Sequence, residues 1–287
     1  DGRTYYNNSE GDLHTTWTDK GQTRSWSHKL SKSFLDDKLK MYVSYSNTDA
    51  RDVFAAGSST QGSNYGKYAT CNNQFYPDLC TKPSLWGRDE RWVGTLDYTA
   101  DIFGAENPTR FYLFWKRESG RRFSYTYDDN IIGDGYRDER DLWYVPTGPG
   151  DPLVSFSDDT GDAFYAYVDK YLSSYKGQVA PANGFQAPWI TRMDLKITQE
   201  LALPEGRWVG DTKAELFLDI YNFGNLLDED NGQIYDAGYL GVTKSMDVDI
   251  VDGAYVYSNF DDGHLRYRNG ARFISVWKMM LGFKLSF

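Results

Sequence analysis

Two groups of residues in this sequence have the types and spacing that could do chemistry: a cysteine pair and three acidic stretches. Cys71 and Cys80, in CNNQFYPDLC, are the two cysteines of the chain. In an oxidising compartment, a pair this close in sequence is typical of a loop closed by a disulfide. A metal site is the alternative. It would need two more ligands, and His14, His28 and His264 lie far from the pair in sequence.

The acidic stretches are candidates for calcium, which is bound by carboxylate and carbonyl oxygens. They read DEDNG at 228–232, DVDIVDG at 247–253 and FDDGH at 260–264. The first begins like a calcium loop, but Gln233 occupies the sixth place, where such loops need glycine, and no glutamate stands at the twelfth. We therefore predict solvated acidic loops and no cofactor, with loop calcium left open as the alternative.

Signatures of catalysis are absent from the sequence. It contains no G-x-S-x-G, no phosphate-binding P-loop and no H-E-x-x-H, and three histidines leave little scope for a nucleophile and histidine pair. A net charge of -10 also argues against a nucleic-acid partner, because neutralising phosphates takes a basic surface. We predict that the protein is neither an enzyme nor a nucleic-acid-binding protein.

The residues of 277–287, WKMMLGFKLSF, alternate between large apolar side chains and a second, more polar set. A period of two is typical of a β-strand with one apolar face. Two lysines, a glycine and a serine lie on the opposite face. The apolar face is Trp277, Met279, Leu281, Phe283, Leu285 and Phe287.

Similar alternation predicts seven strands in all. They are expected at 23–34, 39–48, 91–102, 109–119, 189–201, 212–223 and 277–287. The connections alternate in length, with short ones at 35–38, 103–108 and 202–211 and long ones at 49–90, 120–188 and 224–272. Short links at one end of the strands and long links at the other are typical of outer-membrane barrels, whose turns face the periplasm and whose loops face outside.

The composition fits a membrane barrel. No stretch approaches the roughly 18 consecutive apolar residues of a membrane helix. The 23 Tyr, 16 Phe and 9 Trp would supply aromatic girdles at the two membrane interfaces. We predict an all-β fold, namely an antiparallel transmembrane β-barrel with long extracellular loops, held in outer-membrane lipid. A soluble carbohydrate-binding β-protein is also aromatic-rich and stays the alternative.

Seven strands cannot close a bacterial barrel by themselves, because such barrels have even strand numbers and no open edge in lipid. Residues 1–287 are therefore expected to be one portion of a larger barrel, with the other strands in the same polypeptide or in a second chain. The segment that starts at Asp1 has neither the basic start nor the apolar core of a signal peptide. The chain is expected to begin after a cut.

Charged residues fall on the polar faces of two predicted strands, where they would face the barrel lumen. A salt-bridged wall is the favoured interpretation, since the water-facing walls of large barrels are polar. Contacts that guide a substrate through the lumen are the alternative. The residues are Arg192, Asp194, Lys196, Glu215 and Asp219.

One stretch, 158–177, departs from the strand pattern. Its apolar and aromatic residues recur at helical spacing, which predicts a short amphipathic helix within the loop 120–188. Asp158, Asp159 or Thr160 would cap its start. The apolar stripe is Phe164, Tyr167, Val168, Tyr171, Leu172 and Tyr175.

The later part of the chain resembles a known family. WKMMLGFKLSF resembles the C-terminal signal that outer-membrane proteins present to the barrel assembly machinery. NGFQAPWITRMDLKITQEL, followed by ELFLDIYNFGNLLDED, resembles the closing strands of TonB-dependent outer-membrane receptors, most closely the Oar-like group. The resemblance begins near Asn183, and the earlier part of the chain fits only by its strand pattern.

The resemblance implies a 22-stranded barrel in the outer membrane of a Gram-negative bacterium, of which 1–287 would be the C-terminal portion. It also implies an N-terminal plug domain inside the barrel, and a segment through which the plug contacts TonB. Neither the plug nor that segment is visible in this sequence, so both are expected elsewhere.

The function that follows is transport, the active import or handling of a substrate too large or too scarce for porins. Loop aromatics would capture the ligand at the cell surface, and TonB would displace the plug. The candidate capture residues are Trp86, Tyr125, Tyr127, Trp143 and Tyr144. A structural or adhesive surface protein that displays loops on the same barrel is one alternative function. The soluble carbohydrate-binding protein is the other, and it requires the apolar residues of 277–287 to be packed in a core.

Overall fold

One large antiparallel sheet dominates the structure. The computed structural model describes residues 18–54, 57, 59–60, 64, 71, 80–131, 140–203, 212–237, 241–262, 265–267 and 274–286. Seven long strands pair in the order β1 (Gln22–Phe34), β2 (Leu39–Asp52), β4 (Glu90–Ala100), β5 (Thr109–Glu118), β11 (Ile190–Leu201), β12 (Lys213–Tyr221) and β17 (Lys278–Ser286). A two-residue strand, β3 (Lys82–Pro83), pairs with the end of β2.

All pairs of neighbouring long strands are antiparallel, so the predicted all-β, antiparallel fold is confirmed. Each of the seven predicted strands is present, and no end differs from its prediction by more than four residues. The prediction succeeds because each strand carries a sustained period of two with many aromatic and β-branched residues, which favour a pleated, half-buried surface.

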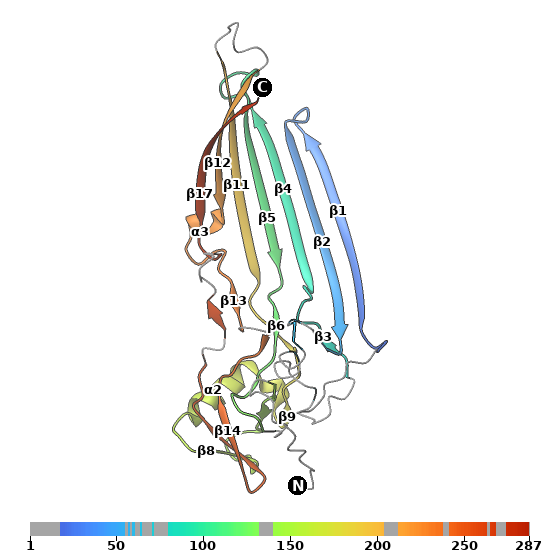
Figure 1. Cartoon of the computed structure of the whole chain (residues 1–287), viewed down its shortest axis with the longest axis vertical. Helices are drawn as coiled ribbons and strands as arrows, with labels where there is room; N and C mark the ends of the chain where they lie inside the picture. The colour runs from blue at the N-terminus through green and yellow to red at the C-terminus, as the bar shows by residue number, and fades with distance from the viewer. Residues whose placement is uncertain are drawn as a thin grey trace.

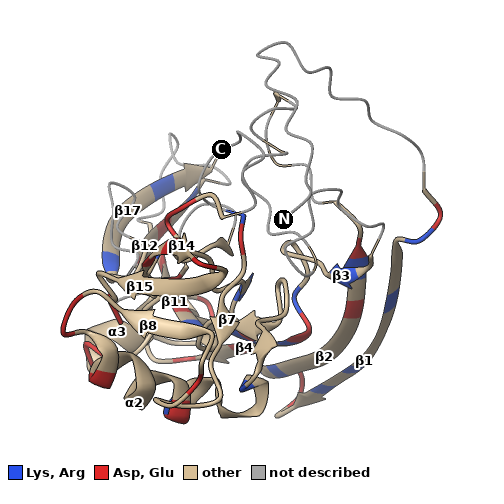
Figure 2. Cartoon of the chain, turned by 90° about the horizontal axis from the view of Figure 1, so that it is seen from below, with Lys and Arg blue, Asp and Glu red and all other residues tan. Residues whose placement is uncertain are grey.

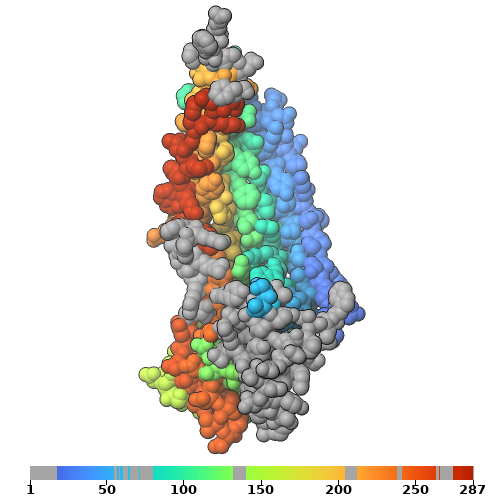
Figure 3. Space-filling view, viewed as in Figure 1, coloured from blue at the N-terminus to red at the C-terminus, as the bar shows by residue number. Residues whose placement is uncertain are grey.

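The connections lie at opposite ends of the sheet according to their length. Figure 1 shows the links 35–38 and 101–108 at the upper end of the strands, where β11 ends and β12 begins, while the chain after β5 and after β12 descends below the sheet. We call the described residues of 119–189 and 222–277 the lobe. Figure 3 shows the side chains of the seven strands as a continuous surface above it. Seen from the lobe end, the strands follow an open arc from β1 to β17 (Figure 2).

The lobe is a folded body made of short elements, where the sequence predicted long loops with one helix. Its small sheets pair β6 (Arg122–Phe123) with β10 (Phe185–Gln186), β7 (Tyr144–Val145) with β9 (Gln178–Val179), β13 (Tyr235–Asp236) with β16 (Arg266–Tyr267), and β14 (Asp247–Val251) with β15 (Ala254–Ser258) and β8 (Val154–Phe156). Because β8 pairs with β15 in parallel, the two long connections that form the lobe, after β5 and after β12, share one sheet.

The predicted helix is present as α2 (Gly161–Tyr171), followed by the 3₁₀ turn η1 (Ser173–Tyr175). Its N-cap is Thr160, whose backbone N–H and hydroxyl both donate to the Asp158 carboxylate. The helix buries Phe164 and Val168, part of the predicted stripe. A second, shorter helix, α3 (Phe223–Leu227), follows β12. Neither helix in the described part of the chain is long and apolar enough to cross a membrane.

The one extensive buried core among the described residues lies in the lobe. Phe123, Trp143, Phe164 and Tyr257 lie at its centre, with ring centroids such as those of Trp143 and Phe164 separated by 5.6 Å. Interlocking aromatic rings of this kind stabilise through large buried area and edge-to-face contacts. The sheet and the lobe therefore hide apolar surface to very different extents.

Candidate functional site on the two faces of the sheet

The strand register divides the side chains of the sheet into an apolar face and a polar face. Directly paired residues point to the same side of a sheet, so one paired row assigns every strand. The row that starts at Met279 runs through Ile220, Leu195, Leu113, Leu96 and Met41 to Lys32. The large apolar side chains of this face are Trp26, Leu30, Phe34, Leu39, Met41, Val43, Tyr45, Trp92, Leu96, Tyr98, Phe111, Leu113, Trp115, Met193, Leu195, Ile197, Leu201, Leu216, Leu218, Ile220, Met279, Leu281, Phe283 and Leu285. The same register places His28, Lys32 and Arg117 on this face.

Large apolar side chains of this face are exposed in β1, β2, β4, β12 and β17, and most of those in β5 and β11 are half-buried. Leu30 in β1 exposes 69% of its surface and Leu281 in β17 exposes 70%. Ile220 is the only large side chain of this face that is buried. A soluble sheet protein would cover such a face with a second layer. Here the second layer is missing from the described residues, and the face meets the surroundings of the chain.

Aromatic rings gather at the lobe end of the apolar face. The ring of Tyr45 lies 5.2 Å from that of Trp26 and 4.5 Å from that of Trp92, centroid to centroid. Further along the same end, Trp189 lies just before β11 and Trp277 just before β17, and both are exposed. An aromatic row beside an apolar band is the arrangement that membrane barrels place at the headgroup level.

The residues with the predicted assembly-signal pattern lie on and beside this face. Met279, Leu281, Phe283 and Leu285 belong to the apolar face of β17 and are exposed, and Trp277 immediately precedes the strand. Phe287, the last member of the predicted set, lies outside the described residues. The structure thus shows the alternation of the pattern, while its recognition by an assembly machinery stays a prediction.

The polar face gathers the five charged residues that were predicted to share it. Lys196 pairs with Asp219 of the neighbouring strand at 3.1 Å between Nζ and Oδ1. Arg192 Nε lies 3.0 Å from Asp194 Oδ1, and Glu215 pairs in register with Lys284 of β17. Most of these charges therefore have an opposite charge beside them, as a salt-bridged wall requires.

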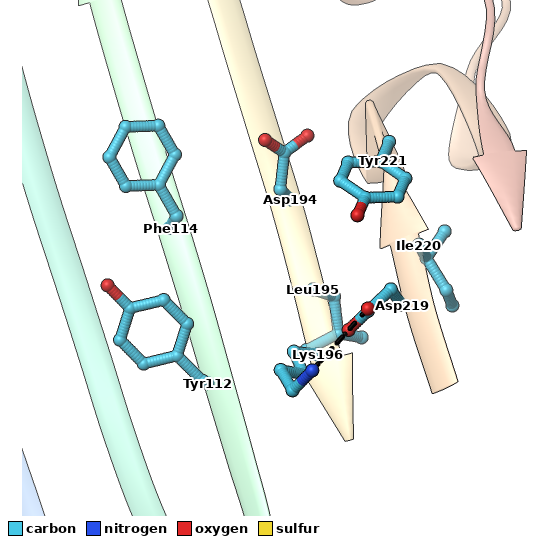
Figure 4. Close-up of a pocket in the computed structure, with 8 residues that line it drawn as sticks. All are labelled: Tyr112, Phe114, Asp194, Leu195, Lys196, Asp219, Ile220 and Tyr221. Carbon is cyan, nitrogen blue, oxygen red and sulfur yellow. Dashed lines mark hydrogen bonds and ion pairs between the residues drawn. The ribbon is translucent and has the colours of Figure 1, made fainter. Parts of the chain in front are cut away.

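A hollow of about 290 Å³ lies on this wall (Figure 4). Besides Asp194, Lys196 and Asp219, it is lined by Tyr112, Phe114, Leu195, Ile220 and Tyr221. Asp194 also accepts a hydrogen bond from the backbone N–H of Asn222 at 2.7 Å, which fixes the chain after β12. Because both of its carboxylates are engaged, Asp194 by Arg192 and Asp219 by Lys196, the hollow has the character of a salt-bridged wall surface.

Gly282 explains one detail of the polar face. A Cβ at this position would lie 2.2 Å from the ring of Phe217, its cross-strand partner. The glycine thus leaves room for the Phe217 ring beside the neighbouring strand, and an aromatic ring across from a glycine is known to support it in sheets. The ammonium of Lys196 then lies 4.6 Å from the centroid of the same ring. The ring and the Lys196–Asp219 pair form one packed unit.

The five predicted capture aromatics separate into two groups. Tyr125, Tyr127 and Trp143 are buried in the lobe core, with at most 2% of their surface exposed. Tyr144 is half-buried, and Trp86 exposes 54% of its surface in the connection before β4. The first three rings therefore hold the lobe together in this structure, and Trp86 and Tyr144 are the ones that a ligand can reach. The sequence of a loop does not show which aromatic rings are buried and which are accessible to a ligand, because loops lack the periodic pattern that marks a buried face.

The buried tyrosines form hydrogen-bonded pairs. Tyr257 donates its hydroxyl hydrogen to the carbonyl of Tyr144 at 2.8 Å, so Tyr127 must be the donor in the 2.9 Å contact between the Tyr127 and Tyr257 hydroxyls. Burial raises the pKa of Tyr125 to about 12, and burial also raises the pKa of Tyr127. These hydroxyls stay protonated at neutral pH and serve as structural links inside the lobe.

The predicted disulfide is present, because Cys71 and Cys80 are bonded, with their Cα atoms 6.5 Å apart. Among the described residues, no group of three or more His, Cys, Asp or Glu side chains gathers as a metal site would. In the stretch 228–232, Asp228 instead accepts hydrogen bonds from the Asp230 N–H and from the Asn231 amide. His264 lies outside the described residues.

Sequence reasoning missed a group of cations where the polar face meets the lobe. Arg88, Arg91 and Lys116 surround the carboxylate of Glu118, a residue with 6% of its surface exposed. The positions of Arg91, Lys116 and Glu118 on the polar face could have been found by aligning the predicted β4 with the predicted β5. Arg88 lies outside any predicted strand, so its approach has no signal in the sequence.

Comparison of the chain with protein-family models, with curated proteins and with solved structures gives no match. The resemblance to TonB-dependent receptors therefore stays a prediction, which must be judged on the geometry of the two faces and of the lobe.

Proposed function

We propose that this chain forms part of the wall of an outer-membrane β-barrel, a receptor of the TonB-dependent type, and that its lobe captures ligand at the cell surface. The observation that carries the proposal is the uncovered apolar face, which spans all seven strands and is exposed in β1, β2, β4, β12 and β17. Soluble monomers rarely expose apolar patches larger than a few hundred Å². Lipid chains are the occupant that suits a face of this width, with the polar face turned to water.

The stagger of the strands supports a barrel. Along the row from Met279 to Lys32, β17 begins one residue before Met279, whereas β1 begins ten residues before Lys32. At the other end β17 extends seven residues beyond the row and β1 only two. The mean shift is about seven residues over six strand spacings, which corresponds to a strand tilt of roughly 40°. Barrels tilt their strands by about 35–45°.

The height of the apolar face also agrees with the height of the apolar band in outer-membrane barrels. From Trp26 to Phe34 the apolar residues of β1 span eight residues, or roughly 26 Å along the strand. At the tilt given above this projects to about 20 Å, close to the roughly 25 Å apolar band of outer-membrane barrels. Lys32 lies within the band, and its ammonium reaches toward the Phe34 ring, 6.0 Å away, near the short-link end. A lysine beside a membrane interface extends its charge to the headgroups in this way.

The open edges of the sheet call for further strands. Among the described residues, β1 pairs only with β2 and β17 only with β12. An unpaired edge leaves backbone N–H and C=O groups without partners, which is too costly in lipid. In the proposed barrel, strands of the same polypeptide or of a second chain close the circle, and a plug fills the lumen and contacts TonB.

The orientation of the lobe follows from the same comparison. All described short links lie at one end of the sheet, and the lobe occupies the other (Figure 1). In outer-membrane barrels the longer connections face outside. We therefore place the lobe on the cell surface. The half-buried Tyr144 of the lobe and the exposed Trp86, in the connection before β4, are the capture candidates that remain accessible.

A pair of cysteine variants tests the proposal. Leu281 and Met280 are neighbours on opposite faces of β17, and both are exposed. Since the native cysteines are bonded to each other, Leu281→Cys or Met280→Cys supplies the one free thiol for a polarity-sensitive fluorophore. In lipid vesicles we expect a blue-shifted, lipid-quenchable emission from the label at 281 and a water-like emission from the label at 280. Equal, water-like emission from both labels contradicts the membrane wall.

One observation favours a second candidate function, a structural or adhesive surface protein that displays the lobe on a barrel. Three of the five predicted capture aromatics are buried, so they stabilise the lobe and leave few aromatic rings accessible to a ligand. Mass spectrometry of the native polypeptide that contains these residues separates the two candidates. A plug and a TonB-contacting segment in that polypeptide favour the receptor, and a barrel without them favours display.

The soluble carbohydrate-binding alternative required the apolar residues of 277–287 to be packed in a core. In the structure Met279, Leu281, Phe283 and Leu285 are exposed instead. Extraction of native membranes gives a direct check, because carbonate washes off a soluble protein, whereas a barrel wall needs detergent.

A further inference from the structure

A cluster of cations lies where the polar face meets the lobe. The Glu118 carboxylate contacts Lys116 Nζ at 2.9 Å, Arg91 Nε at 3.2 Å and Arg88 Nε at 3.9 Å. A fourth cation, Arg121, lies 3.6 Å from Asp236 and acts electrostatically on Arg88. We call Arg88, Arg91, Lys116, Arg121, Glu118 and Asp236 the cation cluster.

The cluster carries more positive than negative charge. Among the described residues, four cations share two carboxylates, and Glu118, the acid at the centre, is almost fully buried. Burial lowers the pKa of Arg88, and the neighbouring charges of Arg121 and Arg91 lower it further, against the effect of Glu118. The arginines are therefore held close together in partly desolvated surroundings, where a further anion would relieve their repulsion.

The surroundings of the cluster make this excess unusual. The two long connections, 119–189 and 222–277, contain 20 acidic and 10 basic residues, so they account for the whole net charge of -10. Figure 2 shows acidic segments on α2 and on the loops around it. A free anion is repelled by most of the lobe and attracted at the cluster.

The neighbouring Arg122 does not add to the excess of positive charge in the cation cluster, because it has its own carboxylate partner. Arg122 is bound by Asp89 through two contacts, and the Gln186 amide donates to the same carboxylate at 2.7 Å. This one-to-one pair anchors β6 to the connection before β4. The contrast separates a closed structural pair from an open group of cations beside it.

We propose that the cation cluster is a binding site for an oxyanion, a phosphate or carboxylate group of the ligand. Arginine presents two N–H donors in a planar fork that matches both groups, and Lys116 adds a point charge. Under the proposed function, the cluster lies at the mouth of the lumen, and the inference rests on that function for its place in transport. Anion binding itself requires only the folded chain.

Inorganic pyrophosphate is the probe for the test, with citrate as the carboxylate probe and tetramethylammonium chloride as the cationic control. Titration calorimetry of the full chain in detergent micelles measures the affinity for each. We expect binding of both anions, weakened by added salt, and none of the cation. Absence of binding at millimolar pyrophosphate and citrate overturns the proposal.

Two arginines provide a matched pair of variants. Arg91 pairs with Glu118 in the cluster, whereas Arg110 pairs with Glu200 at 3.4 Å at the far end of the same face. Arg91→Gln should weaken pyrophosphate binding at least tenfold, and Arg110→Gln should change it less than twofold. Equal effects of the two substitutions contradict a localised site.

Glu118→Gln keeps the test independent of misfolding. Removing the central carboxylate frees its three cations, so pyrophosphate affinity should rise several-fold, which a damaged fold cannot imitate. Unchanged or weaker binding by a folded Glu118→Gln variant overturns the proposal. The fluorophore labels at 280 and 281 are measured under the same conditions. Loss of anion binding with the expected label emission contradicts only the anion site, whereas water-like emission from both labels contradicts the proposed membrane wall.

Discussion

In the sheet Leu281 exposes 70% of its surface, whereas in the lobe Trp143 exposes none. Both regions belong to one chain, and both are rich in large apolar side chains. The lobe collects them into a core, as proteins in water do. The sheet turns them outward and places ion pairs on its opposite face. Under the proposed function, this difference reflects two solvents, lipid at the apolar face of the sheet and water around the lobe.

The strongest test of the comparison is a deletion in the lobe core. Trp143→Ala should destabilise the lobe by about 3–5 kcal/mol, because it removes a fully buried ring and leaves a cavity. Trp86→Ala, in the connection before β4 and outside the lobe, is the control with the same substitution, since loss of its exposed ring should cost less than about 0.5 kcal/mol. Limited proteolysis and denaturant unfolding measure both. Equal losses would mean that the lobe has no core of its own.

The next test introduces a charge on each face of the sheet. Leu281→Arg should cost about 2–4 kcal/mol in lipid vesicles, because a charge on a lipid face must be desolvated. Met280→Arg, on the adjacent polar-face position, should be close to neutral. Urea unfolding in vesicles gives both values. If arginine is tolerated equally at 280 and 281, the apolar face does not meet lipid.

Alkaline pH should act on the lobe through its buried tyrosines. The pKa of Tyr125 is raised to about 12 by burial, above its ordinary value of 10.0, so the unfolded chain releases this proton first. The contribution is fully present below pH 10 and is lost as pH rises to about 12, by roughly 1 kcal/mol per pH unit for this group. Near-UV circular dichroism should show the loss, and Tyr125→Phe should remove the share of it that Tyr125 contributes. A lobe signal that is independent of pH up to 12 contradicts the buried hydroxyl.

The smallest effect concerns an exposed ion pair. Arg110→Ala breaks the contact with Glu200 on the polar face and should cost at most about 1 kcal/mol, because solvent screens such pairs. Raising the salt concentration should shrink the difference from the native chain. A larger, salt-independent cost would show that this end of the polar face is less open to water than the structure indicates.

The sequence was sufficient to predict the sheet because the sheet repeats a simple rule. Alternation predicted the strand positions. It also placed the five charged residues of β11 and β12 on one face and the apolar residues Met279, Leu281, Phe283 and Leu285 of β17 on the other. The exact partners needed the register, which the hairpin connections and the stagger set. The Lys196–Asp219 pair follows once the two strands are aligned.

The lobe could not be predicted in the same way. Its strands are two to five residues long, too short for a period of two to emerge, and its core joins segments far apart in sequence. Tyr125, Tyr127 and Trp143 were predicted to meet ligand because they are aromatic residues in a long connection. Only tertiary packing decides that these rings turn inward while Trp86 stays exposed.

The sharing of one small sheet by both long connections has a consequence for the order of folding. The hydroxyl contact between Tyr127 and Tyr257 bridges 130 positions of the chain, whereas β1 and β2 are joined across four residues. Contacts between distant positions form slowly, because a long loop must close before they are gained. The hairpins of the sheet can therefore form one after another as the chain is delivered, but the lobe core must wait for β15. We expect the lobe to be the last part of the molecule to fold, and the part that a slow or interrupted delivery leaves unfinished.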